Sequence, residues 1–295
     1  MTLVSQVSHG RIETPLLMGV VNVTPDSFSD GGLWADSESA VAHALQLVED
    51  GADVVDVGGE STRPGATRPV AAEEVGRVLP VIEALSADGV LVSVDTMRAE
   101  VAARAIEAGA RIVNDVSGGL ADDGMLAVVA DSDATYVAMH WRAHAARMRD
   151  FATYDPEDGG VVSIVRDELS RRVEAITAAG IGLERVVLDP GLGFAKRPEH
   201  DWALLRHLDV LHGLGLPLLI GASRKSFLGR LRGAGGPLRA VAAREAATTA
   251  LTTWLGMQHP SVWGIRVHDV HASRDALDVL ARLAAPPSDD APEGS

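Results

Sequence analysis

Two residue types that are rare in this chain stand where they could do chemistry. The 295 residues contain 24 arginines but only two lysines, Lys196 and Lys225. They also contain only two asparagines, Asn22 and Asn114. Because the composition favours Arg and Ala elsewhere, we expect such rare residues to mark positions where the common substitute would not serve. The two lysines and the two asparagines are therefore the first candidates for a functional site.

Other polar side chains divide into two chemical groups. Asp95, Asn114 and Asp189 carry oxygens that could accept hydrogen bonds from a planar heterocycle rich in N–H groups. A second group consists of donors suited to an anion such as diphosphate. These donors are Arg63, Arg266 and His268.

The composition excludes several other function classes. The chain has no cysteine, so disulfides, thiolate metal sites and cysteine nucleophiles are absent. A formal net charge of −15 argues against general binding to nucleic acid or to an anionic membrane. No Gly-x-Ser-x-Gly elbow or close pair of glutamates indicates a hydrolase or a glycosidase. Residues 1–10 contain no basic residue and no long apolar run, so we expect a soluble, cytoplasmic protein.

A repeated pattern predicts the elements that position these side chains. An amphipathic helix is followed by a glycine and then by a short, Val-rich apolar run that ends in a polar residue. Eight strands are expected at residues 17–22, 54–58, 91–95, 112–115, 135–140, 186–189, 218–221 and 265–268. Helices are expected at 37–50, 73–86, 98–108, 125–130, 161–179, 201–211, 239–255 and 273–283.

Eight alternating units predict an α/β fold, an eight-stranded parallel (β/α)8 TIM barrel. We expect a single domain over residues 1–283, with a short N-terminal hairpin, lacking a helix, that plugs the barrel bottom. Residues 284–295, rich in proline and acid, are expected to form a disordered tail. A doubly wound open sheet is the alternative, but no Gly-x-Gly-x-x-Gly follows the first strand. In a barrel, the polar residues at the strand ends would converge on one face.

Seven motifs in chain order resemble those of the dihydropteroate synthase family, the folate-pathway enzymes that sulfonamides inhibit. The resemblance covers residues 17–283, nearly the whole chain. The motifs are NVTPDSFSDGG at 22–32, DVGGESTRPG at 56–65, SVDT at 93–96, ND at 114–115, DPGLGF at 189–194, SRKSF at 223–227 and RVH at 266–268.

The resemblance implies a transferase that condenses 6-hydroxymethyl-7,8-dihydropterin diphosphate with 4-aminobenzoate. The products are 7,8-dihydropteroate and diphosphate. It also implies that diphosphate leaves first and that the weakly nucleophilic aniline then captures a pterin cation. Catalysis would then rest on positioning and charge stabilisation. The resemblance further implies Mg²⁺ as cofactor and a homodimer formed through the late barrel helices.

Site roles follow from the resemblance, residue by residue. It implies a pterin site lined by Asp95, Asn114, Asp189 and Lys225, with Met139 as an apolar wall. Diphosphate would be held by Asn22, Arg266 and His268, and Asn22 would give Mg²⁺ an oxygen ligand. The aminobenzoate site would comprise Thr62, Arg63, Pro64, Phe194, Lys225 and Ser226. Phe28 and Asp30 would belong to a first loop that closes over bound diphosphate.

Two other functions stay open on the sequence alone. A pterin-binding methyltransferase barrel would share Asp95 and Asn114 but would not need Arg63, Phe194 or Ser226. A non-catalytic pterin-binding paralogue would be expected to lose Asn22, Asp95 or Lys225, and all of these are present.

Several polar residues also have a structural interpretation. Asp56 and Asp115 could either anchor loops or take part in the site, and the role of Lys196 stays open. We expect Arg224 to form a structural ion pair. Residues 140–144, which begin with His140, are expected to be loop and surface without a metal role. Residues 141–160 match no motif. Ala195, within the strand-six loop, is expected to adopt an ordinary φ and to stiffen that loop.

Overall fold

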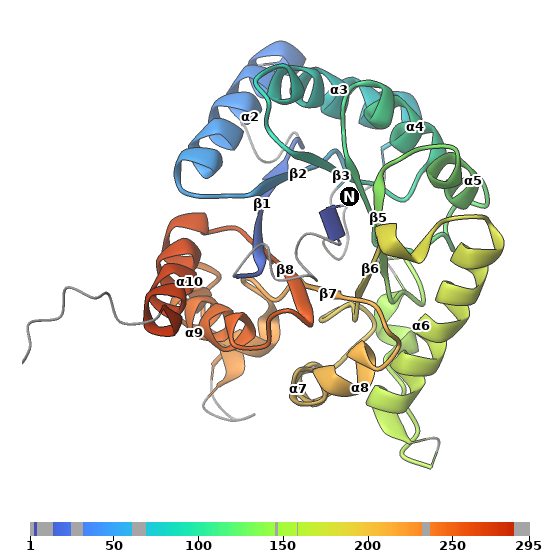
Figure 1. Cartoon of the computed structure of the whole chain (residues 1–295), viewed down its shortest axis with the longest axis vertical. Coiled ribbons are helices and arrows are strands. Elements are labelled where there is room, and N and C mark those ends of the chain that lie inside the picture. The colour runs from blue at the N-terminus through green and yellow to red at the C-terminus, as the bar shows by residue number, and fades with distance from the viewer. Residues whose placement is uncertain are drawn as a thin grey trace, which may run out of the picture.

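Eight parallel strands close into a barrel in the computed structural model of this chain, and helices surround the barrel (Figure 1). The structure describes residues 3–4, 14–24, 32–60, 69–144, 147–157, 159–231 and 237–285. The strands are β1 (Leu16–Asn22), β2 (Val54–Gly58), β3 (Val92–Asp95), β4 (Ile112–Asp115), β5 (Thr135–Met139), β6 (Val186–Asp189), β7 (Leu218–Ile220) and β8 (Val262–Val267).

The α-helices lie outside the barrel and fall between the strands in the predicted order. They are α2 (Gly32–Glu49), α3 (Ala71–Ala87), α4 (Ala99–Glu107), α5 (Met125–Ala130), α6 (Gly160–Ala178), α7 (Pro198–Arg206), α8 (Leu208–His212), α9 (Glu245–Gly256) and α10 (Val270–Ala284). Short 3-10 turns include η1 (Met148–Phe151) and η3 (Ser226–Arg230). None of the helices in the described ranges is long and apolar enough to cross a membrane.

The expected (β/α)8 barrel is confirmed, with local differences. The helix predicted at 201–211 is two helices, because the chain bends at His207, whose φ of −124° and ψ of 40° are not helical. Strand β8 begins three residues earlier than predicted, at Val262. Leu218 pairs with Val262 and Leu219 pairs with Gly264, so Trp263 is skipped in the pairing with β7 and forms a β-bulge.

Burial at the bottom of the barrel follows from side-chain alternation along the strands. Because successive residues of a strand face opposite sides, every second residue points into the barrel. The lower interior is a single apolar cluster. Its buried members are Val4, Leu16, Met18, Val54, Ile112, Val137, Val187, Leu219 and Trp263.

The N-terminal segment contributes to this cluster. Val4 is 4% exposed and packs within it. This agrees with a plug at the barrel bottom. The expectation that the segment lacks a helix is wrong for the described residues Leu3 and Val4, which are helical. The rest of the expected hairpin lies outside the described residues, as do residues 286–295 of the expected tail.

A second apolar core lies between the outer faces of the strands and the helices. It joins Leu17 and Val57 on strands to Ile82 and Leu85 on α3, all of them fully buried. With apolar clusters filling the lower interior and the outer layer, polar side chains can gather only where the strands end.

Truncating the barrel interior is expected to destabilise the protein. Leu219→Ala would remove a fully buried side chain of the lower cluster and leave a cavity. We expect it to lower the free energy of unfolding by about 2–5 kcal/mol in urea denaturation. The matched control is Leu283→Ala, at a side chain that is 78% exposed, with an expected change within about 0.5 kcal/mol. Equal losses in the two variants would contradict this assignment of the core.

Candidate active site

Polar side chains occupy the carboxyl ends of the strands, a region called here the barrel mouth. Alternation along β2, β3 and β8 turns Asp56, Asp95 and Arg266 inward, where they contact one another. The register places Asn22 level with Gly58, and Gly58 level with Asp95. The further inward positions at strand ends are Asn114, Met139 and Asp189.

Arg266 bridges two carboxylates across the mouth. Its Nε donates to Oδ2 of Asp56 at 2.6 Å, and its Nη2 donates to Oδ2 of Asp95 at 2.8 Å. Asp56 is fully buried, so the ion pair is shielded from solvent and removal of one partner would leave a buried charge. Burial raises the pKa of Asp95 to about 7, although the Arg266 charge opposes this shift. Asp95 therefore titrates near neutral pH.

Asp56 also orients the asparagine at the end of β4. Nδ2 of Asn114 donates to Oδ2 of Asp56 at 3.0 Å, which turns the amide oxygen of Asn114 the other way. The second oxygen of Asp56, Oδ1, is buried and makes no hydrogen bond to any described residue. The carboxylate of Asp56 thus holds two side chains in place at the mouth, the guanidinium of Arg266 and the amide of Asn114.

Five contacts hold the backbone of the loop after β6, residues 190–197. Oδ1 of Asp189 accepts from N–H of Gly191 at 2.7 Å, and Oδ1 of Asp201 accepts from N–H of Gly193 at 2.7 Å. Lys225 donates to the carbonyl of Leu192. The remaining two contacts come from Lys196 and Tyr154, and they hold the carbonyls of Phe194 and Ala195.

Lys225 joins the loops after β6 and β7. Its Nζ lies 4.8 Å from the centroid of the Phe194 ring, within the range of a cation–π contact. Burial lowers the pKa of Lys225, and the charges of Asp189 and Asp201 oppose this shift. A Cβ at Gly221 would lie 3.9 Å from Lys225, Asp189 and Arg266, so this glycine leaves space where the three side chains meet.

An apolar wall lies beside these charges. Met139 is 3% exposed and clusters with Met97 and Val116, and Phe194 packs against the same cluster. The wall and the charged groups together suit a flat ligand with polar edges.

The remaining predicted residues are distributed as follows. Nδ1 of His268 is 3.0 Å from Oγ of Ser223, which ties the end of β8 to the loop after β7. Ser226 is exposed at the first position of η3. Asn22 makes no hydrogen bond to another described side chain. Five predicted residues lie outside the described part of the chain: Phe28, Asp30, Thr62, Arg63 and Pro64.

Two expectations about the loops are wrong. Ala195 does not adopt an ordinary φ: its φ of +50° lies in the left-handed region, which non-glycine residues rarely adopt. His140 is not on the surface: it is 2% exposed and hydrogen-bonded on both ring nitrogens. The segment after β5, which matches no motif, supplies two further contacts beside His140. Arg142 binds the carboxylate of Glu168, and the hydroxyl of Tyr154 donates to the carbonyl of Ala195. Sequence motifs missed these residues because their role depends on contacts between distant loops.

Asp115 and Arg224 both make structural contacts. Asp115 faces outward from β4 and accepts from Ser117, Gly119 and Tyr136, so it anchors the following loop. The expected ion pair of Arg224 is confirmed, with Glu245 as its partner.

Sequence reasoning left the position of Asp56 open. Period-two alternation along β2 places it inward, on the same face as Val54 of the lower interior cluster. Sequence reasoning also missed Glu74, a fully buried acid on α3. Glu74 accepts from Thr96 at 2.6 Å and pairs with Arg98 at 3.1 Å. These contacts anchor the loop after β3, directly behind Asp95.

Residues 18–268 match the family described as "Pterin binding enzyme". A dihydropteroate synthase of Mycobacterium leprae (strain TN) is 49% identical over 265 residues, which are 90% of this chain and 92% of the relative. This chain belongs to the dihydropteroate synthase family. The match spans every strand end described above.

Solved structures of the family are similar over nearly their full length. The dihydropteroate synthase of Xanthomonas albilineans with 4-aminobenzoic acid has a TM-score of 0.83 and is 43% identical, covering 93% of this chain and 94% of that one. The same organism's enzyme in complex with 7,8-dihydropteroate has a TM-score of 0.80 and 40% identity, with 97% of each chain covered. The Anaplasma phagocytophilum enzyme with bound 6-hydroxymethylpterin-monophosphate has a TM-score of 0.81 and 36% identity, covering 92% of this chain and 100% of that one.

Removing the bridging guanidinium is expected to leave two buried carboxylates without a counter-charge. Arg266→Met should lower the free energy of unfolding by about 3–5 kcal/mol at about pH 8 in urea denaturation. The loss should be smaller at about pH 5, because protonation then neutralises Asp95, whose pKa is raised by burial.

The matched control is Arg166→Met, which breaks an exposed pair with Asp167 and should cost about 0–1 kcal/mol. A pH-independent loss, or one no larger than that of the control, would contradict the role assigned to Arg266.

Proposed function

We infer that this chain catalyses the dihydropteroate synthase reaction at its barrel mouth. A 7,8-dihydropterin carrying a 6-hydroxymethyl diphosphate condenses with 4-aminobenzoate, and 7,8-dihydropteroate and diphosphate are formed. The observation that carries this inference is the Asp56–Arg266–Asp95 bridge, which places an oriented cation and a carboxylate in one mouth. The relatives that hold 4-aminobenzoic acid and 7,8-dihydropteroate support the choice of substrates.

The pterin is proposed to bind across the ends of β3 to β6. Asp95 and Asp189 would accept hydrogen bonds from its N–H groups, and the amide of Asn114 would contribute its free oxygen. Lys225 would donate to a ring acceptor from the opposite side. Met139 would form the apolar wall against the ring face, in keeping with its burial in the cluster with Met97.

The leaving diphosphate is proposed to bind Asn22, Arg266 and His268. In the part of the chain that the structure describes, Arg266 uses Nε and Nη2 for its carboxylate partners, so Nη1 is left to donate to an anion. Guanidinium groups bind phosphate oxygens through paired hydrogen bonds. Arg266 would thus stabilise negative charge as it develops on the leaving group.

Mg²⁺ is the proposed cofactor, and the donor set fits a weakly held ion. Among the described residues, no group of three His, Asp or Glu side chains is placed to hold a metal. Asn22 offers one amide oxygen, and Mg²⁺ in proteins is commonly bound by one or two side chains, substrate phosphates and water. When bound, the ion would neutralise diphosphate charge. Most of its ligands would come from the substrate.

The aminobenzoate is proposed to bind between the loops after β2, β6 and β7. Phe194 would pack on its ring, and Lys225 and Ser226 would approach its polar end. Thr62, Arg63 and Pro64 complete the proposed site, and Phe28 and Asp30 are proposed to belong to a loop that closes over the diphosphate. These last five residues lie outside the described part of the chain.

The proposed order of bond changes suits a poor nucleophile. The bond between the pterin methylene carbon and the diphosphate oxygen breaks first, and both electrons leave with the diphosphate. The aniline nitrogen then bonds to the methylene carbon and loses a proton. Asp95 would stabilise the intermediate pterin cation through its negative charge, so departure of the leaving group is the step the site assists most.

A homodimer and a cytoplasmic location are also part of the proposal. An apolar groove of about 520 Å³ runs between α7, η3 and α9, and two of its lining residues, Leu231 and Trp254, are 46% and 37% exposed. Such a surface suits a second copy of the chain. Because the substrates are polar anions that cross membranes poorly, the cytoplasm is the proposed location.

The proposed reaction is tested by supplying the protein with Mg²⁺, 4-aminobenzoate and the dihydropterin diphosphate and by measuring both products. Equal amounts of diphosphate and dihydropteroate are expected. Diphosphate without dihydropteroate would mean that the aminobenzoate assignment is wrong. If neither product forms although the pterin binds, the proposed activity is wrong.

Turnover is expected to rise with pH through about 7, because only ionised Asp95 can stabilise the pterin cation and burial raises the pKa of Asp95 to that value. Asp95→Asn should lower kcat more than it weakens pterin binding, and its turnover should lose the rise near pH 7. Steady-state kinetics over about pH 5.5–9, with pterin affinity from calorimetry, measure both effects. A variant that loses only pterin affinity would rule out this role.

A further inference from the structure

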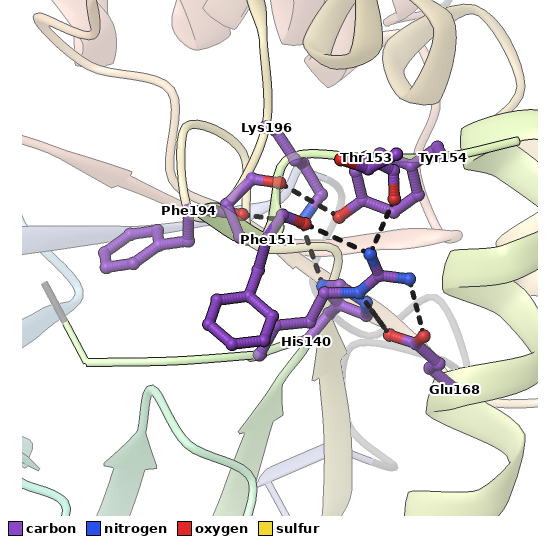
Figure 2. A network of polar contacts seen from close by, with 9 residues as sticks. His140, Phe151, Thr153, Tyr154, Glu168, Phe194 and Lys196 are labelled. Carbon is purple, nitrogen blue, oxygen red and sulfur yellow. Dashed lines mark hydrogen bonds and ion pairs between the residues drawn. The ribbon is translucent and has the colours of Figure 1, made fainter. Parts of the chain in front are cut away.

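A closed ring of contacts lies beside the mouth, on the outer side of Phe194 (Figure 2). Nζ of Lys196 is 2.9 Å from Nδ1 of His140, and Nε2 of His140 is 2.6 Å from Oε2 of Glu168. Arg142 binds the same carboxylate through two nitrogens, at 3.0 Å and 2.6 Å.

The ring closes through an aromatic side chain. The guanidinium of Arg142 lies 4.2 Å from the centroid of the Tyr154 ring. The hydroxyl of Tyr154 donates to the carbonyl of Ala195 at 3.1 Å. Ala195 is bonded directly to Lys196, where the contacts begin, so the ring of contacts is closed.

Three separate segments are joined in this way. His140, Arg142 and Tyr154 belong to the segment after β5, and Glu168 belongs to α6. Ala195 and Lys196 belong to the loop after β6, which also carries Phe194. Arg142 further donates to the carbonyls of Phe151 at 3.1 Å and Thr153 at 2.8 Å, which shapes the first segment around the ring (Figure 2).

The protonation states agree with the geometry. Burial, assisted by the Lys196 charge, lowers the pKa of His140 to about 4, so its imidazole is neutral. Nδ1 then accepts from Lys196, and Nε2–H donates to Glu168. Burial would raise the pKa of Glu168, but the hydrogen bonds from His140 and Arg142 outweigh it and lower the pKa to about 2. His140 and Glu168 therefore each have one fixed role. Burial also lowers the pKa of Lys196 to about 7, but its charged and neutral forms both carry N–H groups that can donate to His140 and to the carbonyl of Phe194.

The ring acts directly on the backbone next to Phe194. Lys196 Nζ also donates to the carbonyl of Phe194 at 3.1 Å, and Tyr154 holds the carbonyl of the next residue, Ala195. Ala195 has a φ of +50°, a conformation that an alanine keeps only when its surroundings hold it. Without these two contacts, the loop could relax and move the Phe194 ring away from Lys225.

We propose that this ring positions the acceptor substrate: Lys196, His140, Glu168, Arg142 and Tyr154 hold Phe194 where it packs against 4-aminobenzoate. This inference rests on the proposed placement of aminobenzoate beside Phe194. The five ring members are positioning residues and touch neither substrate. Lysine suits its place because the three N–H groups of a compact ammonium can donate to His140 and to the carbonyl of Phe194 at the same time.

Two variants test the ring at different points. Tyr154→Phe removes only the hydroxyl and leaves an aromatic ring beneath Arg142. Lys196→Met removes the donor to His140 and Phe194 and keeps a side chain of similar length. Each should raise the KM for 4-aminobenzoate roughly three- to tenfold, as expected for the loss of one or two hydrogen bonds. Pterin affinity should stay within about twofold, because the pterin contacts lie on other residues.

Coupling between the variants gives a second readout. If the contacts act as one ring, the double variant should raise KM less than the product of the two single effects. The control is Thr253→Val, which removes a hydroxyl that donates to a backbone carbonyl at 3.0 Å on α9, away from the mouth. It should leave the KM for aminobenzoate unchanged.

Phe194→Leu separates failure of the ring from failure of the proposed aminobenzoate site. If Phe194→Leu raises the KM for aminobenzoate while Tyr154→Phe and Lys196→Met do not, the ring proposal is overturned and the site assignment stands. If Phe194→Leu has no effect on this KM, the site assignment is wrong and the ring proposal falls with it. A fall in kcat and pterin affinity together, without a selective rise in KM, would show a merely structural role and would also overturn the proposal.

Discussion

The buried carboxylate of Asp56 is the constraint on which the barrel mouth depends. A fully buried charge is tolerated only with partners, and Asp56 has two, Arg266 from β8 and Asn114 from β4. These bonds cross the barrel interior and join strands that are not neighbours in the sheet. They also leave Arg266 directed toward Asp95, so that one anion fixes the cation, the amide and, through the cation, the second carboxylate. The arrangement of charges in the mouth is therefore set by contacts within the chain itself.

The loop after β6 is controlled by the same kind of bond, from side chain to backbone. Asp189, Asp201, Lys225, Lys196 and Tyr154 each hold one backbone group between Gly191 and Ala195. Both lysines of the chain serve this loop, Lys225 from the inner side and Lys196 from the outer side. In a dissociative reaction the acceptor must already stand beside the cation when the leaving group departs. A loop held at this many points can provide that placement, and it explains why Ala195 keeps a left-handed conformation.

Much of this architecture was predictable because it depends on local patterns. The helix–glycine–strand repeat predicted all eight strands. The rare residues Asn22 and Asn114 lie at strand ends, and Lys225 lies in the loop after β7, as predicted. Residues whose roles depend on contacts between distant segments were not predictable in this way. His140, Glu168, Arg142 and Tyr154 form no spaced motif, and only the folded chain brings them to Lys196. The φ of Ala195 was wrongly predicted for the same reason, because Tyr154 and Lys196 override the local preference of alanine.

Asp56→Asn is the most direct test of the account, because it removes one charge while keeping shape. Turnover is measured as dihydropteroate formation at saturating substrates, with folding verified by circular dichroism and urea denaturation. The account predicts a folded protein whose turnover falls at least about a hundredfold, in the range found when one preorganised electrostatic contact is lost. A folded variant with turnover close to that of the unaltered chain would contradict the claim that Asp56 organises the site.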